Sequence, residues 1–181
     1  MKKTVSVFCG SSKPKNSSFI EKQVNKLAEL ITKNKIKLVY GGAKIGLMGL
    51  LAQQIIKNNG EVIGVIPKVL KKKEIILDGL TEMHIVDTMH QRKKMMYDLA
   101  DFFIILPGGI GTLDEFAEIV TWKGLKITEK KIFLLNIDGF YDNLLKQFGV
   151  MKENDFLHQD IFSDIIILKT TSEIKTLLNF N

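Results

Sequence analysis

The sequence has one cysteine, three prolines and no long apolar run, and these shortages exclude several classes of protein. A single cysteine, Cys9, cannot form a disulfide within the chain, so nothing points to an oxidising compartment. No apolar run approaches the roughly 18 residues that span a bilayer. The apolar stretch that follows the first lysines is too short for a secretory signal and ends in a turn. We therefore expect a cytoplasmic protein with no membrane partner.

Aromatic residues make up only 8% of the chain, although the net charge is +6. Some of the basic residues form four short clusters, which are Lys2-Lys3, Lys71-Lys72-Lys73, Arg92-Lys93-Lys94 and Lys130-Lys131. None of these clusters is interleaved with aromatic side chains that would stack on bases. We expect no nucleic-acid partner, and we interpret most clusters as solvated faces, with one serving a small anionic ligand.

Histidine is also scarce, and the three histidines show no metal-ligand spacing: His84, His90 and His158. With no cluster of cysteine and histidine either, we expect no metal site. Cys9 ends a predicted strand beside the expected site. Because no histidine is evidently paired with it, we interpret Cys9 as a small buried residue rather than a nucleophile.

Short apolar runs alternate with helical patterns along the whole chain, which is typical of an α/β protein with a doubly wound, mostly parallel sheet. Several runs are apolar throughout, as expected for strands covered on both faces. We predict one domain over residues 1–181, with six to seven strands and helices on both faces. The predicted strands are Thr4–Cys9, Lys37–Tyr40, Glu61–Ile66, His84–Val86, Phe102–Leu106, Ile132–Asn136 and Ile165–Leu168. The predicted helices are Ser18–Lys33, Leu47–Lys57, His90–Ala100, Leu113–Lys123, Tyr141–Gly149 and Ser172–Leu178.

Three turns rich in small residues follow predicted strands, where ligands bind in such sheets. They are residues 9–12 (CGSS), 41–43 (GGA) and 107–112 (PGGIGT). The segment from Gly41 to Gly46 has P-loop spacing but lacks the Lys-Ser/Thr that follows in a P-loop. The third turn lacks the last glycine of a dinucleotide fingerprint and follows a late strand. We expect neither an ATPase nor an ordinary NAD-binding domain.

The third turn is the strongest candidate for a phosphate site. Gly108, Gly109 and Gly111 let backbone amides approach an anion, and a helix beginning at Thr112 or Leu113 adds its free N–H groups and dipole. Thr112 can cap that helix, and Glu115 has capping-box spacing to it. On spacing alone, Glu115 is either part of a helix cap or a catalytic carboxylate.

A second candidate is the segment 89–94 (MHQRKK), which opens a helix. It is either a basic amphipathic helix or a source of anion contacts, since arginine binds oxyanions with two parallel hydrogen bonds.

These two segments together resemble a known family. MHQRK at 89–93 and PGGIGTLDE at 107–115 are similar to the paired MHxRK and PGGxGTxxE signatures of the Lonely Guy family of cytokinin riboside 5′-monophosphate phosphoribohydrolases, often mislabelled lysine decarboxylases. Further similarity covers nearly the whole chain, at residues 7–12, 38–49, 62–67, 80–82, 121–122 and 134–145. The resemblance implies a Rossmann-like fold, a homodimer, no cofactor, and hydrolysis of the N-glycosidic bond of a nucleoside 5′-monophosphate.

The resemblance also implies roles for individual residues. It implies that Arg92 and Glu115 are the catalytic pair. It implies substrate contacts from Glu74, Lys93, Gly108, Gly109, Ile110, Gly111, Thr112, Leu113, Asp114 and Thr121. Two positions depart from the family pattern, Ala43 in place of a third glycine and Asp114 in place of a frequent glutamate.

Two functions other than hydrolysis are the alternatives for this sequence. A non-catalytic nucleotide or molybdenum-cofactor carrier has comparable glycine turns, but the retention of both Arg92 and Glu115 argues against it. Amino-acid decarboxylation is discarded, because no lysine has a recognisable pyridoxal-phosphate context. The sequence leaves the identity of the purine base open.

Overall fold

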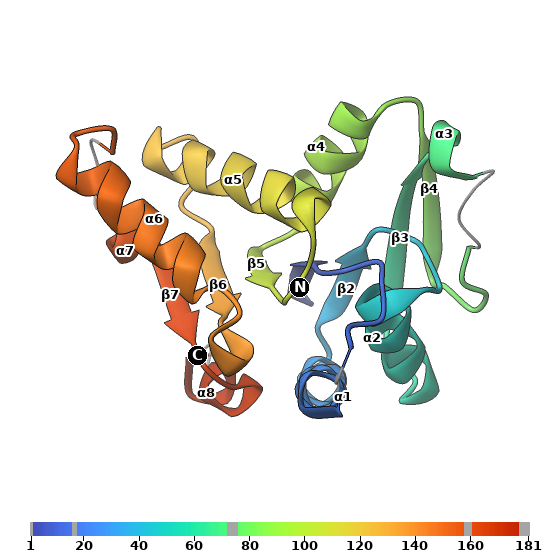
Figure 1. Cartoon of the computed structure of the whole chain (residues 1–181). Helices are drawn as coiled ribbons and strands as arrows, with labels where there is room; N and C mark the ends of the chain where they lie inside the picture. Colours follow the sequence, from blue (N-terminus) through green and yellow to red (C-terminus); the bar gives the residue numbers. More distant parts are fainter. Residues whose placement is uncertain (1, 16–17, 72–75, 158–160, 178–181) are drawn as a thin grey trace.

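The computed structural model describes residues 2–15, 18–71, 76–157 and 161–177. Seven strands form one sheet of parallel pairs in the order β4-β3-β2-β1-β5-β6-β7 (Figure 1). The strands are β1 Thr4–Phe8, β2 Lys37–Tyr40, β3 Val62–Pro67, β4 Glu82–Val86, β5 Phe102–Ile105, β6 Lys131–Leu135 and β7 Ile165–Leu168. The predicted doubly wound α/β fold is confirmed.

Helices cover both faces of the sheet. Figure 1 shows α1 (Ser18–Lys33), α2 (Gly46–Lys57) and α8 (Thr171–Leu177) below the sheet, with α4 (Met89–Leu99) and α5 (Ile110–Gly124) above it. Helix α6 (Asp142–Glu153) packs with α4 and α5, since Leu144, Leu145 and Phe148 contact the same apolar cluster. Alternate strand residues enter the two clusters, so Val5 faces α1 and α2 while Phe8 faces α4 and α5. This two-sided burial explains why the strands are apolar throughout.

Each predicted strand and helix is present, with ends that shift by a few residues. Leu178, the predicted last residue of the C-terminal helix, lies outside the described residues. Three short elements were not predicted: α3 Lys68–Lys71, η1 Ile137–Gly139 and α7 Ile161–Asp164. Each is too short to show a helical period in the sequence.

The predicted start of the fourth predicted helix, Leu113–Lys123, is wrong. Helix α5 begins at Ile110, and Gly109 is its N-cap in an extended conformation. Thr112 therefore lies inside the first turn, where its side chain cannot cap the helix. The turn is shorter than predicted because Ile110 and Gly111 both adopt helical conformations.

The strand order reverses beside β1, which lies between β2 and β5. At the carboxyl ends of these strands the Gly10 amide donates to the Pro107 carbonyl at 3.1 Å. This contact joins the first and third glycine turns at the position where doubly wound sheets bind ligands.

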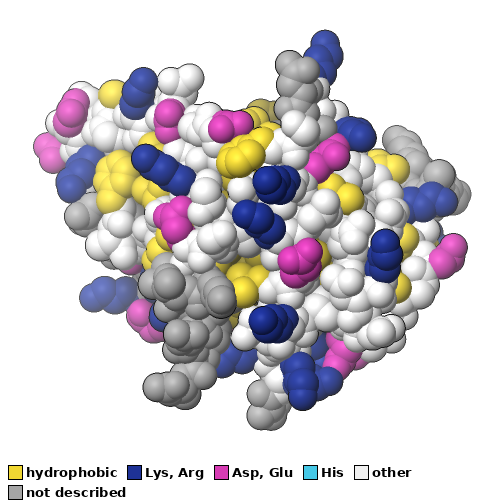
Figure 2. Space-filling model, turned by 90° about the horizontal axis from the view of Figure 1, so that it is seen from below, with side chains coloured by type: hydrophobic (Ala, Val, Ile, Leu, Met, Phe, Trp, Pro, Cys, Tyr) yellow, Lys and Arg dark blue, Asp and Glu magenta, His cyan; other side chains and the backbone are white. Residues whose placement is uncertain are grey.

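Lysines in the described parts of the basic clusters contact neighbouring groups, whereas Lys72 and Lys73 lie outside the described residues. Lys94 pairs with Asp98 at 2.6 Å, and Lys130 lies 4.1 Å from the centre of the Tyr97 ring. Figure 2 shows one face of the molecule, on which lysine and arginine side chains are interspersed with acidic ones. Among the described helices, none combines the length and apolar character needed to cross a membrane.

Candidate functional site

The strongest cluster of buried charge joins α4 to α5 at the carboxyl edge of the sheet. The Nη1 atom of Arg92 lies 3.3 Å from Oε1 of Glu115. Both residues are buried, with 9% and 7% of their surface exposed. Burying two charges is costly unless they are paired and hydrogen-bonded, so this pair is a prominent candidate for function.

Arg92 is held by its helix and by the sheet. Helix α4 opens with a capping box, in which Thr88 accepts from the Gln91 amide and Gln91 accepts from the Thr88 amide. The Arg92 Nε–H donates to the Val65 carbonyl in β3 at 3.2 Å. The backbone and the side chain of Arg92 therefore both have fixed positions. The T-x-x-Q spacing that signals this cap is visible in the sequence but was not among the motifs we identified there.

The N-terminus of α5 is open. Gly109, Ile110 and Gly111 are all exposed, and no described side chain caps the helix. A Cβ atom placed on Gly109 or Gly111 meets no described atom within 4 Å, so the fold itself does not require glycine there. At Gly108, by contrast, a Cβ would overlap the buried side chain of Thr112. Gly109 and Gly111 thus leave the backbone N–H groups at the start of α5 accessible to an anion.

The other glycine-rich helix start at this edge is closed. The Gly10 carbonyl accepts hydrogen bonds from the amides of Leu47 and Met48 at 3.0 and 3.3 Å. These amides belong to the first turn of α2, so a group of the protein already occupies the position that a P-loop gives to phosphate. Between the two helix starts, α5 is the better anion site.

The carboxyl group of Glu115 titrates near neutrality. Burial raises its pKa from the ordinary value of 4.5 to about 7, and the guanidinium of Arg92 opposes this rise. Asp114 and Glu118 add to the rise, while Lys93 acts against it. A pKa near the working pH suits a general base, because the group is then both ionised and basic.

Lys93 is engaged with two carboxylates. Its Nζ atom lies 3.1 Å from Asp114 and 3.3 Å from Glu118, and only 11% of the side chain is exposed. The sequence did not reveal Glu118 as a partner, although it lies one turn beyond Asp114. The three side chains form a charged border beside the Arg92–Glu115 pair.

One residue implied by the family resemblance is not brought to this cluster. Thr121 lies six residues beyond Glu115, which turns its side chain by about 240° round the helix. It lines a separate apolar cavity of about 450 Å³, together with residues such as Leu125 and Phe148. Glu74 lies outside the described residues.

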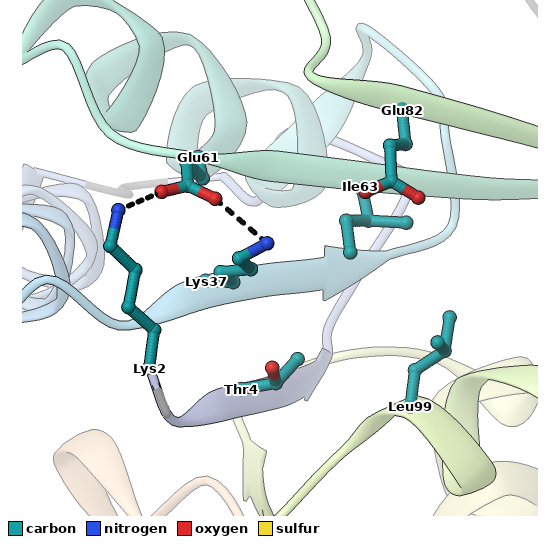
Figure 3. Close-up of a pocket in the computed structure, with 7 residues that line it drawn as sticks. All are labelled: Lys2, Thr4, Lys37, Glu61, Ile63, Glu82 and Leu99. Carbon is teal, nitrogen blue, oxygen red and sulfur yellow. Dashed lines mark hydrogen bonds and ion pairs between the residues drawn. The ribbon is translucent and has the colours of Figure 1, made fainter.

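A second large cavity lies at the opposite edge of the sheet, where β1 to β4 begin. Its volume is about 510 Å³, and Figure 3 shows Lys2 and Lys37 both directed at Glu61. Lys37 pairs with Glu61 at 2.9 Å, and Lys2 pairs with the other carboxylate oxygen. Glu82 also lines the cavity, so two lysines face two carboxylates and the cavity has no strong preference for an ion of either sign.

Cys9 is buried and packs in the core, as predicted. Burial raises the pKa of its thiol far above the usual range, which disfavours the nucleophilic thiolate. Among the described residues, no group of three or more histidine, cysteine or acidic side chains is placed to hold a metal ion.

Comparison with known proteins identifies close relatives. The family model described as "Possible lysine decarboxylase" matches residues 48–178. The cytokinin riboside 5′-monophosphate phosphoribohydrolase LOG4 of Arabidopsis thaliana is 44% identical over 170 residues, which cover 94% of this chain and 79% of that protein. The cytokinin riboside 5′-monophosphate phosphoribohydrolase LOG of Oryza sativa subsp. japonica is 41% identical over 170 residues, which cover 94% of this chain and 70% of that protein.

Solved structures with the same fold are more distant in sequence. The molybdenum cofactor binding protein from Rippkaea orientalis superposes with a TM-score of 0.74 at 21% identity, covering 98% of this chain and 96% of that one. The molybdenum cofactor carrier protein from Chlamydomonas reinhardtii gives 0.71 at 16% identity, with the same coverage. Likeness at these identities establishes the fold alone.

Proposed function

Because this chain belongs to the Lonely Guy family of cytokinin riboside 5′-monophosphate phosphoribohydrolases, we propose that it hydrolyses the N-glycosidic bond of a nucleoside 5′-monophosphate. The products are the free base and ribose 5-phosphate. The observation that carries this proposal is the buried Arg92–Glu115 pair, in which Glu115 lies on α5, the helix whose N-terminus is open to an anion. The Glu115 carboxylate and the phosphate site that we propose lie within two turns of this helix.

The phosphate binds at the start of α5 in this proposal. The amides of the segment from Gly108 to Thr112 hold the phosphate oxygens, and the helix dipole adds about 0.3–1 kcal/mol of attraction. The unfilled space at Gly109 and Gly111 gives the phosphate its approach. Binding of this remote group positions the ribose, so a nucleoside without phosphate is a poor substrate.

Glu115 acts on the sugar. As the C1′–N bond breaks, its electron pair leaves with the base and the ribose takes on oxocarbenium character, which the carboxylate stabilises. Glu115 orients a water molecule, whose oxygen bonds to C1′ and whose proton compensates the negative charge on the base. Arg92 holds the carboxylate in place and contacts the ribose hydroxyls. Lys93, Asp114 and Glu118 maintain the charge balance beside them.

The test is a panel of nucleoside 5′-monophosphates, including AMP and N6-substituted AMP, assayed for free base and ribose 5-phosphate. We expect release from monophosphates and much slower release from adenosine. Glu115→Gln should lose at least two orders of magnitude in kcat. Glu153→Gln is the matched control, since it makes the same chemical change at an exposed position on α6. Full turnover by Glu115→Gln would refute the role of this carboxylate.

The alternative is a carrier that binds a nucleotide or a molybdenum cofactor without reaction. Two solved structures of this fold are a molybdenum cofactor binding protein and a molybdenum cofactor carrier protein. Tight binding of AMP by the purified protein, with no ribose 5-phosphate formed from any member of the panel, would favour the carrier.

We also propose that the protein is a cytoplasmic homodimer, as the family resemblance implies. The apolar cavity beside Thr121 is one surface that a second copy could cover. Light scattering of the purified protein tests the dimer, and a mass of 20.5 kDa, that of one chain, would contradict it.

A further inference from the structure

Gly41 follows β2 and is buried, and its backbone does not explain why it is glycine. The next residue, Gly42, has a φ of +82°, a conformation that favours glycine. Gly41 has no positive φ and could adopt its conformation with a side chain. The reason for glycine at this position must therefore lie in the neighbouring atoms.

The space beside Gly41 is filled by the guanidinium of Arg92. A Cβ atom on Gly41 would overlap Nη2 of Arg92 and would lie 3.4 Å from Cζ of the same side chain. The same Cβ would lie 3.0 Å from Sδ of Met48, so the Met48 side chain leaves little room for a Cβ that turns away from Arg92. Arg92 thus packs directly against the backbone of residue 41.

Arg92 cannot move away from an added side chain without loss. Its Nε–H is bound to the Val65 carbonyl, and its Nη1 faces Glu115. Relief of the overlap at Nη2 requires a shift of the guanidinium by about 1 Å, which lengthens one or both of these contacts. A shift of this size in a catalytic group can lower a rate about 100-fold.

We propose that Gly41 is a positioning residue, whose missing side chain leaves the space in which the Arg92 guanidinium lies against Glu115. The proposal deepens the function given above and rests on it for its catalytic consequence. The geometric part can be tested without any substrate.

The first experiment is a double-mutant cycle on thermal stability. Gly41→Ala should lower the melting temperature by several degrees in the wild-type background. In the Arg92→Ala background, where the guanidinium is absent, Gly41→Ala should cost much less. Equal losses in the two backgrounds would overturn the proposal. If Gly41→Ala does not fold, the proposal requires that the double variant folds, and its failure to fold overturns it.

The second experiment measures turnover of the best monophosphate in the panel. Gly41→Ala, folded at the assay temperature, should lose about 100-fold in kcat. Gly149→Ala is the control with unchanged activity, because a Cβ on Gly149 meets no described atom within 4 Å. Wild-type kcat in folded Gly41→Ala overturns the positioning role. Absence of turnover in the wild type refutes the proposed function instead. In that case the double-mutant cycle on stability still tests whether Gly41 leaves the space that the Arg92 guanidinium fills.

A third measurement separates positioning from general damage. The charged groups that influence Glu115 are Arg92, Lys93, Asp114 and Glu118, and the buried thiol of Cys9 interacts electrostatically with Glu115 and Arg92. Only Arg92 is displaced in Gly41→Ala, and Arg92 lowers the pKa of Glu115. The rising limb of kcat/KM against pH should therefore move to higher pH in Gly41→Ala. An unchanged profile in an impaired variant overturns the proposal.

Discussion

The carboxyl of Glu115 makes protein stability depend on pH in an unusual direction. Its pKa is about 7 in the folded protein against an ordinary 4.5, so the folded state binds more protons between these values. The contribution of this carboxyl to the free energy of unfolding is therefore fully present below pH 4.5. That contribution is lost as the pH rises to about 7. Most carboxylates in folded proteins act the other way.

We expect Glu115→Gln to remove this loss. Between pH 5 and pH 8 the free energy of unfolding of the wild type should fall, relative to the variant, by up to about 3 kcal/mol. Urea denaturation of both proteins at the two pH values measures the difference. Glu153→Gln should follow the wild type. Parallel curves for wild type and Glu115→Gln would show that the carboxyl is already ionised at pH 5.

The burial of Cys9 was correctly predicted from the sequence, because a single cysteine without a paired histidine is most often a small buried residue. The direction of Thr121 relative to Glu115 follows from their separation on one helix, so it was predictable from the sequence. The partners of Lys93, in contrast, depend on how α4 and α5 lie against each other. The sequence pattern within one helix contains no information about that packing. The sequence also left Glu115 as either part of a helix cap or a catalytic group. Because α5 begins at Ile110, Glu115 lies beyond the first turn and is not part of its cap.

At the scale of elements, the N-terminus of α5 has two glycines that the fold does not need. Gly111 lies within the helix, where alanine is more favourable by roughly 0.5–1 kcal/mol. Gly111→Ala should therefore raise the melting temperature. The same Cβ should obstruct the phosphate and raise KM for the monophosphate roughly tenfold, which corresponds to about 1.4 kcal/mol.

Gly149→Ala is the matched control for this prediction. It lies within α6 and has the same open surroundings, so it should gain similar stability with no change in KM. Steady-state kinetics and thermal melts on the two variants decide the matter. A Gly111→Ala enzyme with wild-type KM would place the phosphate elsewhere.

Helix α4 depends on its capping box. Thr88→Ala removes the side chain that accepts from the Gln91 amide and should cost about 1 kcal/mol of stability. Because Arg92 lies one turn beyond Thr88, loosening of this turn should also lower kcat. Thr88→Ser keeps the hydroxyl and should retain most of both quantities. Urea denaturation and kcat measure the effects, and equal loss in the two variants would exclude the cap as the cause.

Long elements were predictable from the sequence because apolar residues recur with a clear period along them. The start of α5 was misplaced because glycine and isoleucine in its first turn carry no helix-start signal. Elements such as η1 and α3 are formed by local turns that depend on tertiary packing, so periodicity does not detect them.

At the scale of the whole molecule, the two edges of the sheet have different characters. The carboxyl edge carries the buried pair and the open helix start, whereas the amino edge carries the solvated ion pairs of Glu61 with two lysines. We infer that the proposed activity belongs to the carboxyl edge alone.

Glu61→Gln tests this division. We expect wild-type kcat and KM, because the substitution lies at the far edge from Glu115. The melting temperature should fall slightly, and the fall should shrink in high salt because exposed ion pairs are screened. Kinetics and thermal melts at two salt concentrations measure both effects. A large loss of activity would show that the amino edge takes part in the reaction.

The close fit between Gly41 and Arg92 also restricts how this chain can change over evolutionary time. While Arg92 is present, a side chain at residue 41 meets the guanidinium, so substitution there is disfavoured first by stability. Once Arg92 has been replaced by a smaller residue, position 41 is free to vary. The two positions therefore have a preferred order of substitution. A descendant that has lost the arginine and then acquired a side chain at residue 41 cannot regain the arginine by a single favourable step.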